Sequence, residues 1–239
     1  MDRREQARIA IFGMGCIGSY TAQLLAKNGV GTLTLADSTM VSLTKKGCYR
    51  TSGEPDSMRL RAVTEARRLK RLCPDIHIRS VSRPVTPDSL QLILPGSWDY
   101  IIDLLGRPES TLSLAAYARK NQIPLIICLS IQKCCDPARL KLSPIGQTPK
   151  TLLPPGLCEL FEDSPSSLCR LAYSEEMAGS PQSLRKDNGC SGCACPPSTA
   201  MTCPKRRLPD TACSSYVSAM AGMLISEEIL LSLTHRKGS

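Results

Sequence analysis

Short apolar runs and helical patterns alternate along the first half of the chain. Residues 8–12, RIAIF, form an apolar run typical of a buried strand, and residues 19–28 repeat apolar positions at helical spacing. The stretch VGTLTLAD, residues 30–37, then alternates as a second strand does. The same analysis predicts helices over 58–72, 86–94, 110–122 and 214–233, and strands over 76–81, 98–105 and 124–130.

The repeated order of strand and helix predicts the fold class. Parallel strands need a crossover, usually a helix, so we expect an α/β fold with a Rossmann-like, doubly wound, mainly parallel sheet. After residue 136, ten prolines between 144 and 209 interrupt any long element. We therefore expect one domain over 1–239, with a Rossmann-like core over 1–135 and Pro/Cys-rich loops over 136–239. The last helix is apolar almost all round, which predicts packing on the sheet or on a partner subunit.

Length and composition support one globular unit, because 239 residues with 42% hydrophobic content can bury one substantial core. The net charge of +9 favours polyanionic partners, and RNA is one of them. A solvated basic surface explains the same charge without a partner. Part of this charge is clustered, in Arg59, Arg61, Arg67, Arg68, Lys70, Arg71, Lys205, Arg206 and Arg207.

The sequence predicts a cytoplasmic protein without a membrane segment. No run approaches the roughly 20 apolar residues that span a bilayer, and residues 1–5 lead directly into a strand pattern. The 13 cysteines are odd in number and unevenly spaced, which favours a reducing compartment over a disulfide scaffold.

A glycine turn joins the first predicted strand to the first predicted helix. Gly13, Gly15 and Gly18 match G-x-G-x-x-G, a pattern that allows a tight turn, close approach of a phosphate and close helix packing. Asp37 ends the second predicted strand, where a carboxylate can bind ribose hydroxyls. These residues predict a nucleotide site, and by themselves they fit both NAD and ATP.

The residues around this turn resemble a known superfamily. GxGxxGSYTAQLLAKNGVGTLTLADSTMVSLT is similar to the start of the ubiquitin-activating-like adenylating superfamily, the ThiF, MoeB and HesA proteins. WDYIID, AAYARKNQIPLI, DPARLKLSPI and LAYSEE are similar to its branch of tRNA threonylcarbamoyladenosine dehydratases, called TcdA. The resemblance covers most of the chain except residues 177–210.

The resemblance implies that ATP and Mg²⁺ are bound and that a carboxylate is adenylated. The carboxylate would belong to a modified tRNA adenosine, which then cyclises, or to a ubiquitin-like or sulfur-carrier protein. Gly13, Gly15, Gly18, Asp37 and Lys45 would bind the nucleotide. Arg61 and Arg50 would neutralise phosphate, Asp103 would hold magnesium, and the protein would form a homodimer through its last helix and proline-rich loops.

Two departures from the family pattern leave other functions open. The family arginine after the second strand falls at Cys48, and the second acid of the V-I-D-A-x-D pattern falls at Gly106. A nucleotide-binding pseudoenzyme or partner subunit therefore competes with an active adenylating enzyme. An NAD-dependent oxidoreductase is the third reading, because the glycine turn with Asp37 also fits that class.

A cluster of cysteines lies in the proline-rich region. C-x-x-C-x-C followed by a fourth cysteine can close around zinc, because short spacings bring thiolates to one side of a turn. Free or redox-active thiols and an iron–sulfur cluster are the alternatives. The predicted structural Zn²⁺ ligands are Cys190, Cys193, Cys195 and Cys203.

Overall fold

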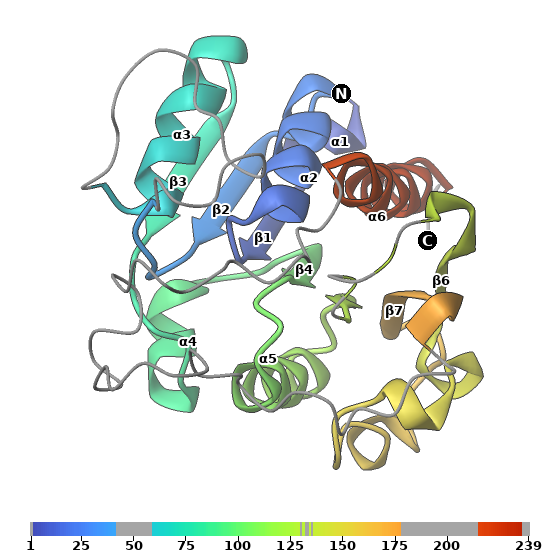
Figure 1. Ribbon diagram of the computed structural model, residues 1–239. Coiled ribbons are helices and arrows are strands. Elements are labelled where there is room, and N and C mark those ends of the chain that lie inside the picture. Colours follow the sequence, from blue (N-terminus) through green and yellow to red (C-terminus); the bar gives the residue numbers. More distant parts are fainter. Residues whose placement is uncertain are drawn as a thin grey trace, which may run out of the picture.

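The computed structural model describes residues 2–41, 59–129, 131, 134, 136–177 and 215–235, and every structural statement below concerns these residues. They form one seven-stranded sheet with helices on both faces (Figure 1). The strands are β1 (Arg8–Phe12), β2 (Thr32–Ala36), β3 (His77–Val81), β4 (Tyr100–Asp103), β5 (Leu125–Cys128), β6 (Leu140–Pro144) and β7 (Cys169–Ser174). The α-helices are α1 (Arg3–Gln6), α2 (Cys16–Lys27), α3 (Arg61–Leu72), α4 (Pro87–Ile93), α5 (Pro108–Lys120) and α6 (Ser215–His235). Short 3₁₀ helices are η1 (Pro137–Arg139), η2 (Ile145–Gln147), η3 (Lys150–Leu152), η4 (Glu159–Phe161) and η5 (Glu175–Met177).

The strand order β3-β2-β1-β4-β5-β7-β6 confirms the predicted fold class. All neighbouring strands are parallel except β6 and β7, which pair antiparallel. The chain winds outward from β1 to β3, then returns to place β4 on the other side of β1. In such sheets ligands bind beyond the carboxyl ends of the strands where the winding direction reverses, which here is between β1 and β4.

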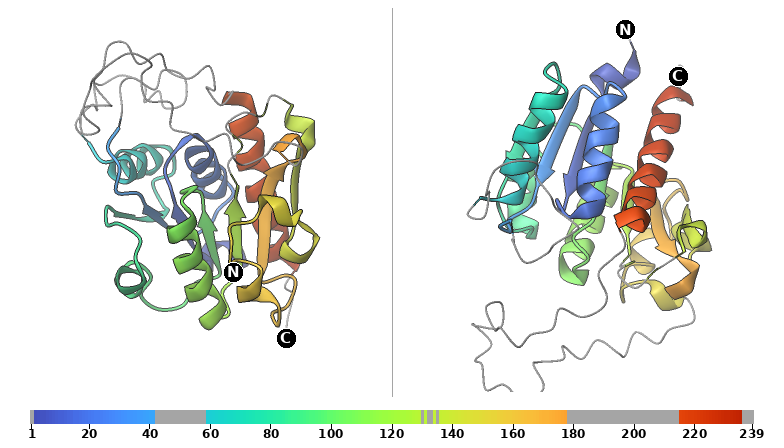
Figure 2. Two further views of the ribbon diagram at one scale, coloured as in Figure 1. Left: turned by 60° about the horizontal axis from the view of Figure 1, so that its bottom comes forward. Right: turned by 45° about the horizontal axis from the view of Figure 1, so that its top comes forward.

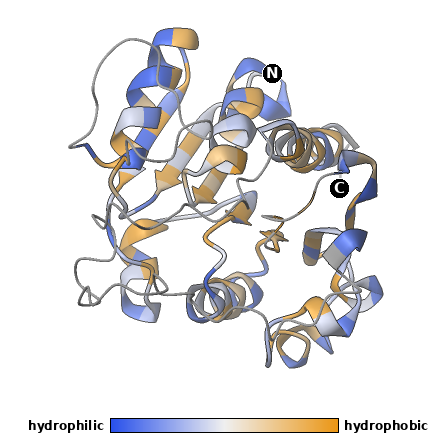
Figure 3. Cartoon of the chain, viewed as in Figure 1, coloured by the Kyte–Doolittle hydropathy of each residue, from blue (hydrophilic) through white to orange (hydrophobic). Residues whose placement is uncertain are grey.

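Two apolar cores lie on opposite faces of the sheet. Alternate residues of a strand point to opposite faces, so Ala10 and Phe12 enter one core while Ile9 and Ile11 enter the other. Helices α4 and α5 cover the first core, and α2, α3 and α6 cover the second (Figures 1 and 2). The hydrophobic colouring of the central strands in Figure 3 matches their burial on both faces.

Strands β6 and β7 were not predicted from the sequence. Prolines border both strands, and no helical or alternating pattern marks them clearly. In the structure β7 is almost fully buried, pairs with β5 and carries β6 at the edge. The region after residue 136 therefore extends the same sheet, because pairing with β5 supplies hydrogen bonds and burial that local sequence does not indicate.

Helix α6 packs against α2 and the sheet, as expected from its apolar sequence (Figure 2). Gly222 allows α6 to approach α2 closely. A Cβ at this position would lie only 2.8 Å from the Cβ of Tyr20, which is too short for a normal contact. Ile225, Ile229 and Leu233 are buried on this face.

No segment was expected to be long and apolar enough to span a membrane. Helix α6 contradicts this expectation by its length and composition. An 18-residue window within Ser215–Thr234 has a mean hydropathy of 1.4, which is enough for a helix that crosses a bilayer. About 44% of that window is buried inside the protein. Apolar core helices have the same composition, so this property alone assigns no membrane role.

Candidate functional site

The glycine turn follows β1 at the carboxyl edge of the sheet. Gly13 has a φ of +100°, and a Cβ at this position would lie 2.7 Å from the carbonyl oxygen of Leu104. A Cβ at Gly18 would lie only 2.0 Å from the carbonyl oxygen of Gly13. Both positions therefore require glycine, the first for its backbone conformation and contact, the second for the contact between helix and turn.

Gly15 differs from the other two glycines, because a Cβ there would meet no atom of the described residues within 4 Å. Gly15 is the N-cap residue of α2, and no side chain caps this helix end. The first N–H groups of a helix lack partners within the helix, and the helix dipole favours an anion beside them. Open space next to an uncapped helix N-terminus therefore fits a phosphate group.

Asp37 connects the end of β2 to the glycine turn. Its Oδ2 accepts a hydrogen bond from the Met14 N–H at 2.7 Å, and its Oδ1 accepts from the N–H and hydroxyl of Thr39 at 2.8 and 2.6 Å. The residue is 5% exposed. Because each carboxylate oxygen can accept two hydrogen bonds, Oδ2 keeps capacity for a ribose hydroxyl while it also fixes the turn.

The segment after β4 lies directly against the glycine turn. The Leu104 N–H donates to the Phe12 carbonyl at 2.8 Å, and the Leu104 carbonyl contacts Gly13 closely. Gly106, two residues further on, has a φ of +63° and open space at its Cβ position. The position where the family pattern has its second acid therefore directly follows residues that contact the turn, and the described residues leave room there for a side chain.

Asp103 is enclosed by the protein. Its Oδ2 accepts from the Thr111 hydroxyl at 2.5 Å and its Oδ1 accepts from the Leu105 N–H at 3.0 Å. Burial raises the pKa of this carboxyl above its usual range, and the two hydrogen bonds oppose that shift. The side chain joins β4 to α5 and the loop between them, and in this arrangement it does not fit a magnesium ligand open to solvent.

Replacing Asp103 with asparagine tests this structural role. Below the ordinary pKa of 3.8, folded and unfolded Asp103 are both protonated. As the pH rises, the carboxyl ionises first in the unfolded chain, because its pKa is lower there than in the folded protein. The free energy of unfolding of wild type therefore falls until the pH passes the raised pKa of the folded state. An uncharged asparagine can accept from the Leu105 N–H with its Oδ1 and donate from its Nδ2 to the Thr111 hydroxyl oxygen, so both contacts persist with the second hydrogen bond reversed. At pH 7 we expect D103N to unfold at a temperature a few degrees higher than wild type does, because each kcal/mol of added stability raises the melting temperature of a chain of this length by about 2–4 °C. Near pH 3 the two proteins should unfold at the same temperature.

The control is Asp75→Asn, which removes one negative charge from an exposed turn. Melting curves of both variants between pH 3 and 8 measure the effect. A D103N protein that is less stable than wild type at pH 7 would show that the charged form is favoured in the fold.

Arg61 and Arg68 of α3 have different positions relative to the turn. The Arg61 N–H donates to the Thr39 carbonyl at 3.0 Å, so the start of α3 lies beside Asp37. The Arg68 guanidinium hydrogen-bonds buried Glu65 and reaches Gln23 and Ser19 of α2 at 2.8 and 3.3 Å. The sequence grouped Arg68 with the clustered basic residues, and in the structure this side chain joins α3 to α2.

Thr39 is a second residue that sequence reasoning missed. The hydroxyl and N–H of Thr39 donate hydrogen bonds to Asp37, and its carbonyl accepts a hydrogen bond from the Arg61 N–H at the start of α3. A threonine two residues after a strand-ending aspartate is a signal for such a turn, because its N–H and hydroxyl can both reach the carboxylate.

The structure brings Gly13, Gly15, Gly18, Asp37 and Asp103 to one end of the sheet, with the start of α3 at Arg61 beside them. Lys45 and Arg50 lie outside the described residues, as does the position of Cys48. The four predicted zinc ligands, Cys190, Cys193, Cys195 and Cys203, are also outside them. Within the described ranges, no group of three or more Cys, His, Asp or Glu is arranged to hold a metal ion.

The fold and this site define a doubly wound α/β protein with a phosphate-type glycine turn. The sequence profile of the ThiF family matches residues 1–239, and the chain belongs to that family. This result confirms the family expected from the sequence.

Two curated relatives show different branches of this family. The tRNA threonylcarbamoyladenosine dehydratase of Escherichia coli K12 is 28% identical over 142 residues, or 59% of this chain and 53% of that protein. The ATP-dependent ubiquitin transferase-like protein Cap2 of Pseudomonas aeruginosa is 38% identical over 102 residues, or 41% of this chain and 18% of that protein. The match to the E. coli dehydratase therefore spans about half of its length.

The solved structures extend the likeness of the fold over nearly the whole chain. E. coli TcdA in complex with ATP has a TM-score of 0.72 and 20% identity, with coverage of 98% of this chain and 90% of that one. The same protein in complex with AMP has a TM-score of 0.74 and 21% identity, with coverage of 97% and 87%. The shared fold includes the C-terminal helix α6.

Proposed function

We propose that this protein binds ATP at the glycine turn and adenylates a carboxylate. A carboxylate oxygen forms a bond to the α-phosphorus of ATP, the bond from that phosphorus to the bridging oxygen breaks, and pyrophosphate leaves. The product is an acyl adenylate. Attack by a second group on the acyl carbon then releases AMP.

The observation that carries this proposal is the uncapped N-terminus of α2 beside open space at Gly15. Backbone N–H groups there stabilise negative charge on phosphate, and Asp37 accepts from a ribose hydroxyl. Arg61 at the start of α3 adds a cation near Asp37. The ATP and AMP complexes of E. coli TcdA, which has the same fold, favour ATP over NAD as the nucleotide.

The proposed substrate is the carboxyl group of a threonylcarbamoyl-modified adenosine in tRNA. The dehydratases among the relatives support this choice, and loss of AMP would accompany cyclisation. Activation of a ubiquitin-like or sulfur-carrier protein is the alternative, supported by the relatives named for those carriers. Either reaction would take place in the cytoplasm.

A nucleotide-binding pseudoenzyme is the second candidate, and a specific observation favours it. Of the acids at the turn, Asp37 and Asp103 both accept hydrogen bonds from protein donors, and the family's second acid is replaced by Gly106. Among the described residues at the turn, Asp103 is enclosed and the remaining acceptor capacity of Asp37 is assigned to the ribose, so neither carboxylate is placed to hold Mg²⁺. No step above therefore depends on a particular magnesium ligand in this chain.

Pyrophosphate exchange into ATP separates the candidates. Exchange in the presence of magnesium and a threonylcarbamoyl-modified tRNA supports the dehydratase, and exchange only with a carrier protein supports the alternative. A melting temperature raised by ATP without any exchange supports the pseudoenzyme. Stabilisation by NADH and not by ATP would overturn the proposal in favour of an oxidoreductase.

We also propose a homodimer formed through α6. Tyr216, Met220 and Met223 are 53%, 44% and 48% exposed along one side of this helix, and Tyr20 of α2 is 37% exposed. Such side chains at helical spacing are typical of an interface. Light scattering is expected to give twice the chain mass of 25.9 kDa, and a monomer at micromolar concentration would contradict it.

A further inference from the structure

The positive charge of the described chain is concentrated at one edge of the sheet. Residues 59–83, which include α3 and β3, contain eight Lys or Arg and two Asp or Glu. The other described residues contain eleven Lys or Arg and fifteen Asp or Glu, so together they are net acidic. A basic region among described residues that are otherwise net acidic favours a polyanionic partner at that place.

Helix α3 carries part of this charge on its outer side. Arg67 and Arg71 are one helical turn apart and exposed, while Glu65 and Leu69 on the other side of the helix are buried. No described acidic side chain pairs with either guanidinium. The two charges are therefore available to a partner, and Figure 3 shows the contrast between the hydrophilic and apolar positions of α3.

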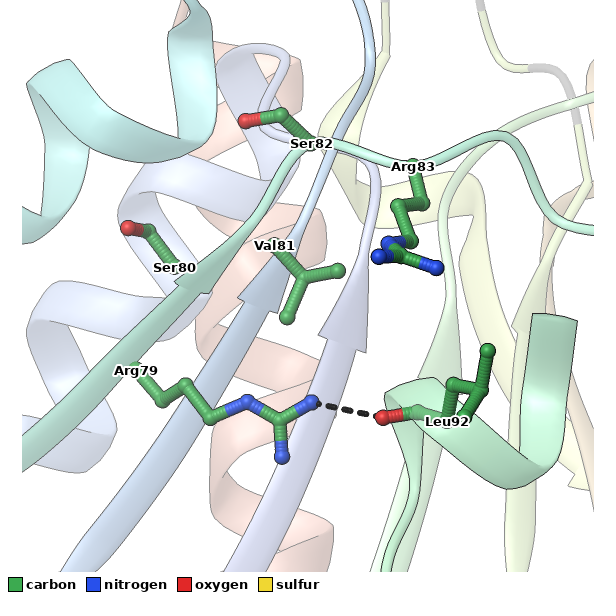
Figure 4. Close-up of a pocket in the computed structure, with 6 residues that line it drawn as sticks. All are labelled: Arg79, Ser80, Val81, Ser82, Arg83 and Leu92. Atoms are coloured by element: carbon green, nitrogen blue, oxygen red, sulfur yellow. Dashed lines mark hydrogen bonds between the residues drawn. The ribbon is translucent and has the colours of Figure 1, made fainter.

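The same edge of the sheet also has a basic groove between β3 and α4, on the face opposite to α3 (Figure 4). Its volume is about 400 Å³, and its lining consists of Arg79, Ser80, Val81, Ser82, Arg83 and Leu92. The Arg79 guanidinium donates to the carbonyls of Leu92 and Ile93 at 3.0 and 2.9 Å, which fixes its position. Arg83 forms no hydrogen bond with a described residue, and its guanidinium extends toward the groove beside Val81.

This groove is next to the candidate nucleotide site. The Asp37 N–H donates to the Val81 carbonyl at 3.0 Å, so the end of β3 that forms the groove also holds the strand end that carries Asp37. Strand β3 is the outermost strand, with α3 on one face and α4 on the other (Figure 1). A long anion on this edge would therefore pass the site of adenylation.

We propose that the α3–β3 edge, defined by Arg67, Arg71, Arg79 and Arg83, binds the sugar–phosphate backbone of a folded RNA. The inference rests on the proposed function, because that RNA would carry the carboxylate to the glycine turn. Helical RNA is recognised by its backbone and shape, whereas single strands are held by stacking on aromatic side chains. Aromatic residues are 4% of the chain, and none lies between residues 59 and 83.

The test measures the affinity of a transcribed tRNA for a triple variant, R67Q/R71Q/R83Q. Arg79 is left unchanged because it holds α4. We expect at least tenfold weaker binding by fluorescence anisotropy at 150 mM salt. The dependence of log affinity on log salt should become shallower by about 2 to 3, because each of the three arginines neutralises about one phosphate.

The matched control is R119Q/K120Q/K150Q, which removes three basic side chains of α5 and η3. Its affinity should stay within twofold of wild type. An equal loss of tRNA affinity in both variants would show that only the total charge of the protein matters. Unchanged tRNA binding by R67Q/R71Q/R83Q would show that these arginines do not form the binding surface. Either result overturns the inference. The inference would also be overturned if these arginines bound phosphatidylserine vesicles more strongly than tRNA, because the surface would then be one that binds a membrane.

ATP-dependent melting shifts and pyrophosphate exchange in the same variants keep this inference separate from the proposed function. An R67Q/R71Q/R83Q protein that keeps its ATP-dependent melting shift but no longer binds tRNA supports the surface. A wild-type protein that binds tRNA through these arginines and never forms AMP from ATP contradicts the proposed reaction, while the surface stands.

Discussion

Gly15→Ala is expected to lose ATP binding while the protein keeps its fold. The backbone angles of Gly15, φ −81° and ψ −161°, are open to alanine, and in the part of the chain that the structure describes its Cβ would contact no atom within 4 Å. The same Cβ would occupy the space through which a phosphate approaches the N-terminus of α2. We expect ATP affinity to fall by more than tenfold, which corresponds to about 1.4 kcal/mol or more, measured by calorimetry and by the ATP-dependent melting shift.

Two other glycines serve as controls for this variant. Gly146→Ala also adds a methyl group to open space, in η2, and should leave both stability and ATP affinity unchanged. Gly18→Ala should destabilise the protein itself, because its Cβ would collide with the Gly13 carbonyl. If G15A binds ATP as tightly as wild type does, the phosphate does not approach the chain at this glycine.

Gly106→Asp is expected to raise the rate of magnesium-dependent AMP formation about tenfold. The family pattern has an acid at this position, and the loop that carries it lies against the glycine turn. Aspartate tolerates the positive φ of Gly106 at a cost of about 1 kcal/mol, and the space around its Cβ is open. A carboxylate there could hold a metal ion, and an electrostatic interaction of this kind is worth several kcal/mol in a transition state.

Gly106→Asn is the matched variant, because asparagine has the same size and the same tolerance of this backbone conformation without the charge. Single-turnover release of AMP at several magnesium concentrations measures both proteins. Faster release of AMP by G106D and not by G106N would show that the missing acid limits the rate of the wild-type protein. Equal rates in the two variants would mean that position 106 does not reach the metal or the phosphates.

The sequence indicated much of the candidate site because its chemistry is local. The glycine turn and Asp37 follow two strands directly, and carboxyl ends of neighbouring parallel strands meet at one edge of a sheet. Leu104 belongs to the same site for a reason that no local pattern contains, since it follows β4, the strand paired with β1, and its carbonyl lies close to Gly13. Lys45, Arg50 and the cysteine cluster stay predictions, because they lie outside the described residues.

Two neighbouring arginines of α3 show the same limit. Arg67 and Arg68 are adjacent and have equal charge, and the sequence grouped both in one cluster of basic residues. The structure leaves Arg67 in solvent and turns Arg68 toward Glu65 and α2, because burial of Glu65 requires a cationic partner.

The sequence by itself determined the winding of β1 to β5, the glycine turn and the apolar character of α6, because periodicity and turn residues act within short stretches of chain. Tertiary structure alone decided the positions of β6 and β7, the enclosure of Asp103 and the basic α3–β3 edge beside Asp37. These features depend on pairing and packing between residues far apart in sequence, whose energies no local pattern records.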